Sequence, residues 1–249
     1  MARLGMSEHV FISLFIGVIV AEVSKSFNEA FSLLLHFAII FIATFYVIFT
    51  KKGFYILSLA LPSVLRLLNF SMPIFFPYTI YWFPLVYAPV FASVYVTVKV
   101  LDLSTDDIGL RMDRFYIYLP IAILIGYVLG SIEYRILQPE SLLPEFTISN
   151  VLTLFIVMFV FVSLAEELVF RSVLQTSLEN NFGLLKGLLL ATTVFAVMHA
   201  DRGPAEFVFV FSGGLLMGYI FQRTRSLFFV TVIHGTMNAL VFGLFQAYS

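Results

Sequence analysis

The stretch FTISNVLTLFIVMFVFVSLAEELVFRSVLQ, residues 146–175, decides the fold class of this chain. Its first 18 residues carry no charge, yet two adjacent glutamates and an arginine follow soon after. About 20 consecutive apolar residues suffice for a helix to cross the roughly 30 Å hydrocarbon core of a bilayer. We therefore predict a membrane-spanning helix over 150–176 that carries Glu166, Glu167 and Arg171.

Apolar runs of this kind recur along the whole chain. The 249 residues are 61% hydrophobic and only 12% charged, whereas soluble domains are about 25% charged. The runs do not alternate between apolar and polar residues, which excludes a transmembrane β-barrel. The chain is therefore predicted to be an all-α polytopic transmembrane bundle of about eight, or nine, spans. The predicted spans are 9–24, 30–50, 54–70, 78–100, 115–136, 150–176, 183–200, 205–222 and 226–246.

Two of these spans admit alternatives. The run 54–70 is short and contains Pro62 and Arg66, so it is either broken or interfacial. The first run could be a signal-like segment preceded by Arg3, but we favour an uncleaved helix because another span follows after a very short loop.

Charge and composition exclude several classes of protein. The net charge of −1 provides no basic surface for nucleic acid, so no nucleic-acid partner is expected. The absence of cysteine excludes disulfides, thiolate metal sites and a cysteine nucleophile. Lys and Arg fall on alternate loops, which places these loops in the cytoplasm. They contain Lys51, Lys52, Lys99, Arg111, Arg114, Arg223 and Arg225.

The longest polar segment, 102–114, divides the chain. Residues 1–114 are predicted to form N-terminal transmembrane helices, and residues 115–249 the catalytic ones, within one integrated bundle. Two GxxxG pairs, Gly126/Gly130 and Gly214/Gly218, are expected to pack helices closely within the monomer.

The first group of chemically active residues is the glutamate pair. Charges near the bilayer centre cost at least about 2.5 kcal/mol, so they are seldom retained without a role. Glu167 and Arg171 stand at i, i+4 and can pair along one helix face. Glu166 then lacks a local partner and is a candidate general base. The alternative is that both glutamates lie in water at the cytoplasmic helix end.

Two further groups carry imidazoles. In FAVMH (195–199), His199 follows Phe195 on the same helix face; alone, it suits a packing histidine. In HGTMN (234–238), His234 and Asn238 share a face, which alone also suits an interhelical hydrogen bond. Together, an acid, two imidazoles and an amide can activate a water molecule and stabilise an oxyanion.

Other polar residues are given structural roles. Ser163 is expected to bond to the backbone of its own helix, and no serine or threonine falls in a cluster suited to a serine protease. His36 and Arg66 have no evident companions and are predicted to be structural or interfacial.

The motifs EELVFR (166–171), FAVMH and HGTMN resemble EExxxR, FxxxH and HxxxN of the CPBP family, the CAAX proteases and bacteriocin-processing enzymes. The resemblance covers about 115–245 and includes the Ras-converting CAAX prenyl endopeptidases. It implies an intramembrane glutamate-type endopeptidase. Glu166, assisted by His199, would activate water, and His234 with Asn238 would bind the oxyanion. Glu167, Arg171 and Phe195 would support the site.

The resemblance also implies a setting and a substrate. The chain would be an integral multi-pass protein of the cytoplasmic membrane if prokaryotic, or of the endoplasmic reticulum if eukaryotic. It would contact membrane lipid and cleave near the C-terminus of a prenylated, membrane-associated peptide. No cofactor is implied, although Glu166, His199 and His234 could form an open zinc site. Substrate identity and oligomeric state stay open.

Two other functions remain as alternatives. The same fold could serve as a bacteriocin-immunity or scaffold protein without proteolysis, and the buried charges could form the ion relay of a transporter. The lack of an inverted repeat disfavours the transporter. The peptidase hypothesis has its own geometric requirement. His199 would lie deeper in the membrane than Glu166, so the two meet only if their helices are staggered, tilted or broken.

Overall fold

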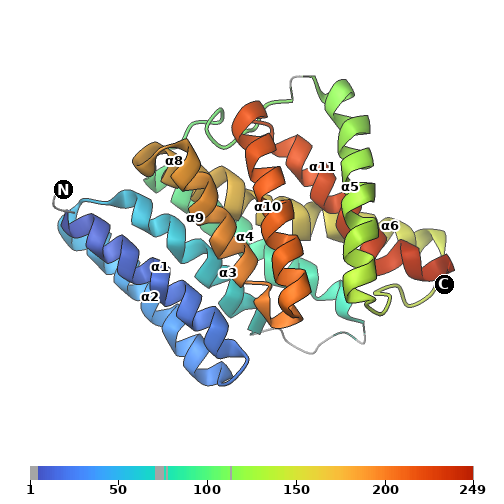
Figure 1. Ribbon diagram of the computed structural model, residues 1–249, viewed down its shortest axis with the longest axis horizontal. Coiled ribbons are helices and arrows are strands. Elements are labelled where there is room, and N and C mark those ends of the chain that lie inside the picture. Colours follow the sequence, from blue (N-terminus) through green and yellow to red (C-terminus); the bar gives the residue numbers. More distant parts are fainter. Residues whose placement is uncertain (1–4, 71–75, 77, 113, 249) are drawn as a thin grey trace.

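The computed structural model describes residues 5–70, 76, 78–112 and 114–248 (Figure 1). Over this part of the chain the fold is helical without any strand, as predicted. Seven helices are long and apolar enough to cross a membrane, and two shorter apolar helices, Phe54–Phe70 and Leu184–Val197, complete the set. These nine correspond to the nine predicted spans. The chain is an integral multi-pass membrane protein.

The helices follow one another with short connections. Arg3, on which the signal-like alternative depends, lies outside the described residues; the helix after it packs against its neighbour as part of the bundle. The principal elements are α1 (Met6–Lys25), α2 (Glu29–Thr50), η1 (Phe54–Leu59), α3 (Ala60–Phe70), η2 (Thr79–Tyr81), α4 (Phe83–Val100), α5 (Phe115–Leu137), α6 (Ile148–Ile156), η3 (Val157–Ser163), α7 (Leu164–Glu167), η4 (Leu168–Gln175), α8 (Thr176–Phe182), α9 (Leu184–Val197), η5 (Ala200–Arg202), α10 (Pro204–Thr224), α11 (Leu227–Ala239), η6 (Leu240–Leu244) and η7 (Phe245–Tyr248).

Elements α6 to α8 form one continuous helical segment, Ile148–Phe182, which we call the long helix. It ends at Gly183, whose φ of 86° a residue with a side chain rarely adopts. The 35 residues rise about 52 Å at about 1.5 Å each, more than the roughly 30 Å hydrocarbon core. The long helix must therefore tilt or protrude, and Figure 1 shows it passing behind α10. The predicted span 150–176 was too short.

The long helix is irregular around the glutamates. Its η3 and η4 parts are π-helical and flank the short α-helical part LAEE on both sides. A π-turn adds one residue to the turn, so it changes the direction in which later side chains point, and it is frequent at functional sites. The apolar periodicity of the sequence did not predict these turns.

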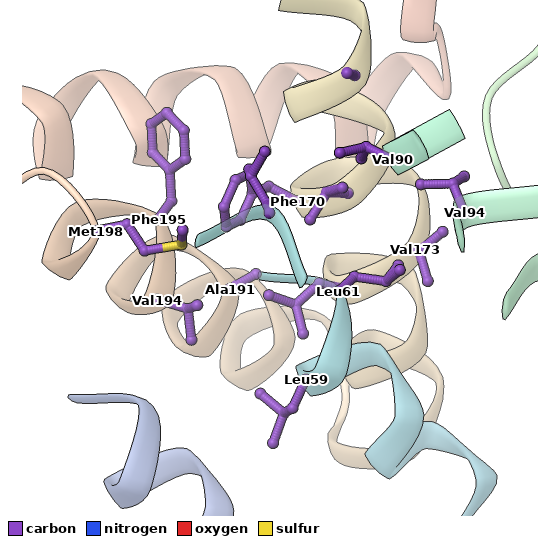
Figure 2. Close-up of a cluster of buried hydrophobic side chains, with 14 of the residues drawn as sticks. Leu59, Leu61, Val90, Val94, Phe170, Val173, Ala191, Val194, Phe195 and Met198 are labelled. Carbon is purple, nitrogen blue, oxygen red and sulfur yellow. The ribbon is translucent and has the colours of Figure 1, made fainter. Parts of the chain in front are cut away.

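The main core joins the N-terminal helices to the long helix and α9. Figure 2 shows apolar side chains from η1, α3 and α4 meeting those of η4 and α9. The buried residues labelled there are Leu59, Leu61, Val90, Val94, Phe170, Val173, Ala191, Val194, Phe195 and Met198. Packing of this kind fixes the long helix and the end of α9 relative to each other.

The prediction that His36 and Arg66 lack companions is wrong. Arg66 Nε donates to Glu22 Oε1 at 2.9 Å, and its Nη2 lies 2.8 Å from Glu22 Oε2. His36 Nε2 lies 3.4 Å from the same carboxylate. All three side chains are buried, so they form an ion-pair network that joins α1, α2 and α3. Their predicted structural role is consistent with this network.

Both GxxxG pairs pack helices within the monomer, as expected. A Cβ on Gly126 would lie 2.6 Å from the carbonyl oxygen of Ile233, so α5 and α11 are in backbone contact there. A Cβ on Gly218 would lie 2.5 Å from Leu188 of α9. The first contact fixes the helix that carries His234.

Candidate active site

Glu166 is held in place by a residue that the motifs did not indicate. It is buried in the middle of the long helix, and the hydroxyl of Tyr87 in α4 donates to Glu166 Oε1 at 2.7 Å. Its other oxygen, Oε2, lies 3.9 Å from His234 Nε2 of α11. The carboxylate thus faces groups from two other helices, and it is not at a solvated helix end.

Glu167 connects the first motif to the third. Its Oε1 accepts a hydrogen bond from His234 Nδ1 at 2.8 Å, so this nitrogen carries the proton, because an ionised carboxylate can only accept. Its Oε2 lies 3.3 Å from Arg171 Nε, which confirms the i, i+4 pair. Arg171 is wholly buried, and its guanidinium stands over the ring of Phe195, 4.8 Å from the centroid.

His199 stands just beyond the end of α9. Its Nδ1 donates to the carbonyl oxygen of Phe195 at 2.8 Å, which leaves Nε2 as the hydrogen-bond acceptor. The ring of Phe195 lies 4.8 Å from the His199 ring and 6.2 Å from the His234 ring, measured between centroids. The carbonyl of Met198 accepts a hydrogen bond from Arg66, so the turn that carries His199 is also anchored.

Glu166 and His199 can meet only if their helices are staggered, tilted or broken, and the short length of α9 provides the stagger. Its 14 residues rise about 21 Å, less than the roughly 30 Å hydrocarbon core. His199 therefore follows a truncated helix, and Glu166 lies midway along the long helix. Both residues line the same cavity.

Asn238 completes the set of predicted residues. Its Nδ2 donates to Ser163 Oγ of the long helix at 3.2 Å, and both side chains are buried. The primary amide has two N–H groups, so one remains for a ligand. Ser163 was expected to bond to its own helix backbone; its contact in the structure orients Asn238.

One cavity of about 170 Å³ brings these groups together. A single water needs only about 10–15 Å³ of such space, so several waters fit. The polar or charged lining residues are Tyr87, Glu133, Glu166, His199, Arg202, His234 and Asn238. The remaining lining is predominantly apolar and aromatic.

Comparison with protein families identifies the part of the chain that carries the motifs. Residues 148–240 match the family model described as Type II CAAX prenyl endopeptidase Rce1-like. This segment is Rce1-like. The match is consistent with the CPBP family and confirms the resemblance seen in the motifs. Searches of curated proteins and of solved structures gave no match.

The Rce1-like match supports a protease-type membrane enzyme at the level of the family. The long helix, α9, α10 and α11 make up the matched segment. Tyr87 and Glu133 lie outside it, yet both line the cavity. The site therefore includes side chains from helices that precede the Rce1-like segment.

Glu133 is a second buried acid in this cavity. Its Oε2 has no hydrogen-bond partner among the described residues, and its carboxyl interacts with Glu206 at the start of α10 and with Arg202. The sequence did not indicate Glu133 as a site residue, because a single glutamate in the span 115–136 has no companion at helical spacing. A charge inside a predicted span was the signal that could have identified it.

The geometry does not support the zinc alternative. No group of three or more His, Cys, Asp or Glu residues in the described part of the chain is placed to hold a metal ion, and this includes Glu166, His199 and His234. The expectation that the site needs no cofactor stays a prediction.

Proposed function

We propose that this chain is an intramembrane glutamate-type endopeptidase, similar to the CAAX prenyl proteases, that cleaves near the C-terminus of a membrane-associated, prenylated peptide. One observation carries the proposal: Glu166 of the long helix, His199 just after α9, and His234 and Asn238 of α11 line a single cavity. An acid, two imidazoles and an amide are the groups that peptide hydrolysis by activated water requires.

Glu166 is the general base in this proposal. It takes a proton from a water molecule, while His199 Nε2 accepts the second hydrogen bond of that water. The resulting hydroxide attacks the carbonyl carbon of the peptide bond. The proton on Glu166 then passes to the leaving amine as the carbon–nitrogen bond breaks, so the enzyme returns to its starting state.

His234 and Asn238 bind the oxyanion of the tetrahedral intermediate. Asn238 uses the N–H that Ser163 does not occupy. Because the Nδ1 proton of His234 is donated to Glu167, His234 donates to the oxyanion through Nε2 in its doubly protonated form. The carboxylates of Glu166 and Glu167 flank that imidazolium and balance its charge.

The lining of the cavity supports a lipid-modified substrate. Its apolar part is large relative to its few polar groups, which is typical of sites for apolar ligands. The apolar lining residues include Phe83, Met158, Val162, Val210, Met217, Met237 and Phe242. A prenyl group next to the cleaved bond would bury its hydrocarbon there.

Cleavage of a farnesylated CaaX peptide by the purified protein tests the proposal. Replacing Glu166 by Gln keeps the shape of the side chain but removes the base, so kcat should fall by about 10²–10⁴-fold. Glu140→Gln is the matched control, because this exposed glutamate lies outside the cavity.

Three outcomes separate the hypotheses. Loss of activity in Glu166→Gln but not in Glu140→Gln supports Glu166 as the general base. Equal cleavage by the wild type and Glu166→Gln removes Glu166 from the mechanism. No cleavage of any membrane-associated peptide by the wild type overturns the peptidase and favours a non-proteolytic immunity or scaffold protein.

A further inference from the structure

A second cavity, of about 260 Å³, adjoins the candidate active site. We call it the polar cavity and the first one the apolar cavity. Five residues line both: Phe83, Tyr87, Glu166, His199 and Arg202. Glu166 and His199 therefore stand where the two cavities meet, and a ligand at these residues can extend into either.

The two cavities differ in charge. Apart from the shared residues and a few polar groups, the apolar cavity is lined by Met, Leu, Val, Phe and Gly. The polar cavity carries three cationic side chains, Lys25, Arg66 and Arg202, together with the amide of Asn69. Its carboxylates are Asp201 and Glu166. This lining suits an anionic group that is bound close to the candidate base.

Two of the three cations are already neutralised. Arg66 pairs with Glu22 through two nitrogens. Lys25 pairs with Asp201. Burial alone would raise the pKa of Asp201, but the hydrogen bond from Lys25, together with the positive charges of Lys25, Arg66 and Arg202, holds this pKa below its ordinary value. Asp201 therefore stays ionised and balances Lys25.

Arg202 forms the longest ion pair of the three cations and has the most exposed side chain, although it also interacts with Glu133. Its one ion pair among the described residues joins Nη1 to Glu206 Oε1 at 3.6 Å, and 41% of its side chain is exposed. Its other N–H groups can form the two parallel hydrogen bonds by which a guanidinium binds a carboxylate. The short turn η5 places Arg202 close after His199 in the chain.

We infer that the polar cavity binds the free C-terminal carboxylate of the substrate, with Arg202 as the anion-binding side chain. The inference rests on the proposed function. The substrate extends from its lipid-modified residue in the apolar cavity, past Glu166, to a chain end in the polar cavity. A peptide whose C-terminus is an amide, or continues further, lacks the anion that Arg202 binds.

Two matched peptides test the inference. They share one farnesylated sequence and differ only in a C-terminal acid or carboxamide. The wild type should cleave the acid with a kcat/KM about 10- to 100-fold higher, the range expected for a hydrogen bond to a charged group. Arg202→Gln should reduce the ratio of acid to amide cleavage to about one, because the side chain that distinguishes the two chain ends is lost.

Arg223→Gln is the control, because it makes the same charge change at the exposed far end of α10 and should keep the preference for the acid. The ratio of acid to amide is measured within each variant, so partial unfolding does not alter it. Equal cleavage of the two peptides by the wild type overturns the inference, as does an equal slowing of both by Arg202→Gln.

A binding measurement separates this inference from the proposed function. Full-length Glu166→Gln protein should bind the fluorescently labelled acid at least about 10-fold more tightly than the amide. The double variant with Arg202→Gln should bind both alike. Equal dissociation constants in Glu166→Gln overturn the carboxylate site. If the protein binds the acid more tightly but the wild type cleaves neither peptide, the carboxylate site is supported and the proposed peptidase activity is overturned.

Discussion

Tyr87 shows how a single hydroxyl can set the geometry of the candidate site. It lies in α4 and is buried, and its hydrogen bond to Glu166 Oε1 leaves Oε2 directed toward His234. Hydrogen bonds to charged groups contribute about 1.5–3 kcal/mol. In the proposed mechanism, Tyr87 therefore positions Glu166.

Replacing Tyr87 by Phe should lower kcat by about 10- to 100-fold and change KM little, because the lost hydrogen bond orients a reacting group rather than the substrate. Steady-state kinetics with the farnesylated peptide measure both constants. Tyr95→Phe is the control, since Tyr95 lies on the same helix but is exposed. A higher KM with an unchanged kcat would assign Tyr87 to substrate binding instead.

The sequence predicted some residues of the site and not others. His234 and Asn238 were predicted because i, i+4 spacing places both on one helix face. Glu166 was predicted because the Glu167–Arg171 pair leaves it without a local partner, and His199 because it follows Phe195 by one turn. Tyr87, Ser163 and Glu133 act on residues more than 70 positions away or have no local partner. A lone tyrosine among 12 carries no such signal, so their roles depend on how the helices pack.

At the scale of the elements, contact between α5 and α11 fixes the position of His234. Gly126 allows the two backbones to meet, since a Cβ there would lie 2.6 Å from the Ile233 carbonyl oxygen and 2.7 Å from Thr236 Cβ. Real side chains do not tolerate such distances. The helices would have to separate, and His234 is the residue after Ile233.

Gly126→Ala should therefore destabilise the protein by about 1–3 kcal/mol, the usual cost of overpacking, and also lower activity. Gly213→Ala is the matched control in α10, because nothing lies within 4 Å of a Cβ at that position. It should be neutral or stabilising by up to about 1 kcal/mol. Thermal unfolding in detergent compares the two. Equal unfolding temperatures would contradict close contact between α5 and α11.

Apolar run length predicted the positions of the nine apolar helices in the described part of the chain, because each run must remain within hydrocarbon. It did not predict where irregular turns fall. The π-helical parts on either side of LAEE add residues to single turns, and composition does not mark them. Nor did it predict that the helix would continue to Phe182, since the residues beyond 176 are polar.

At the scale of the whole molecule, the N-terminal helices take part in the candidate site. Arg66 binds Glu22 and also donates to the carbonyl of Met198, the residue before His199. An ion pair between α1 and α3 thereby anchors a turn of the Rce1-like segment. The proposed division at 114 separates segments of one bundle whose parts depend on each other.

Arg66→Met should destabilise the protein by about 3–5 kcal/mol, because it leaves Glu22 buried without its partner. The double variant Glu22→Gln/Arg66→Met should regain much of that stability, since no unpaired charge remains. Its kcat should stay about 10-fold or more below the wild type, because nothing then holds the Met198 carbonyl. Unfolding temperature and kcat are measured in all three proteins. If the double variant recovers both stability and kcat, the ion-pair network contributes to stability only and does not position the turn that carries His199.

Pairs such as Glu22 and Arg66 were beyond prediction from the sequence. The two residues stand 44 positions apart on different helices. Hydrophobic patterning specifies which segments cross the membrane, but not which face of one helix meets which face of another. The same limit applies to Arg202, whose place between two cavities depends on how α4, α9 and α10 come together.

The meeting of two unlike cavities at Glu166 has a consequence for inhibitor chemistry. A compound with a hydrocarbon tail, a tetrahedral phosphonate in place of the cleaved bond and a terminal carboxylate would occupy both at once. A phosphonate imitates the tetrahedral intermediate, and such analogues bind more tightly than substrates. One molecule would carry the groups for both cavities, so binding in one cavity holds the other group close to its own site. The affinity of the linked compound should therefore be much higher than the affinity of either half alone.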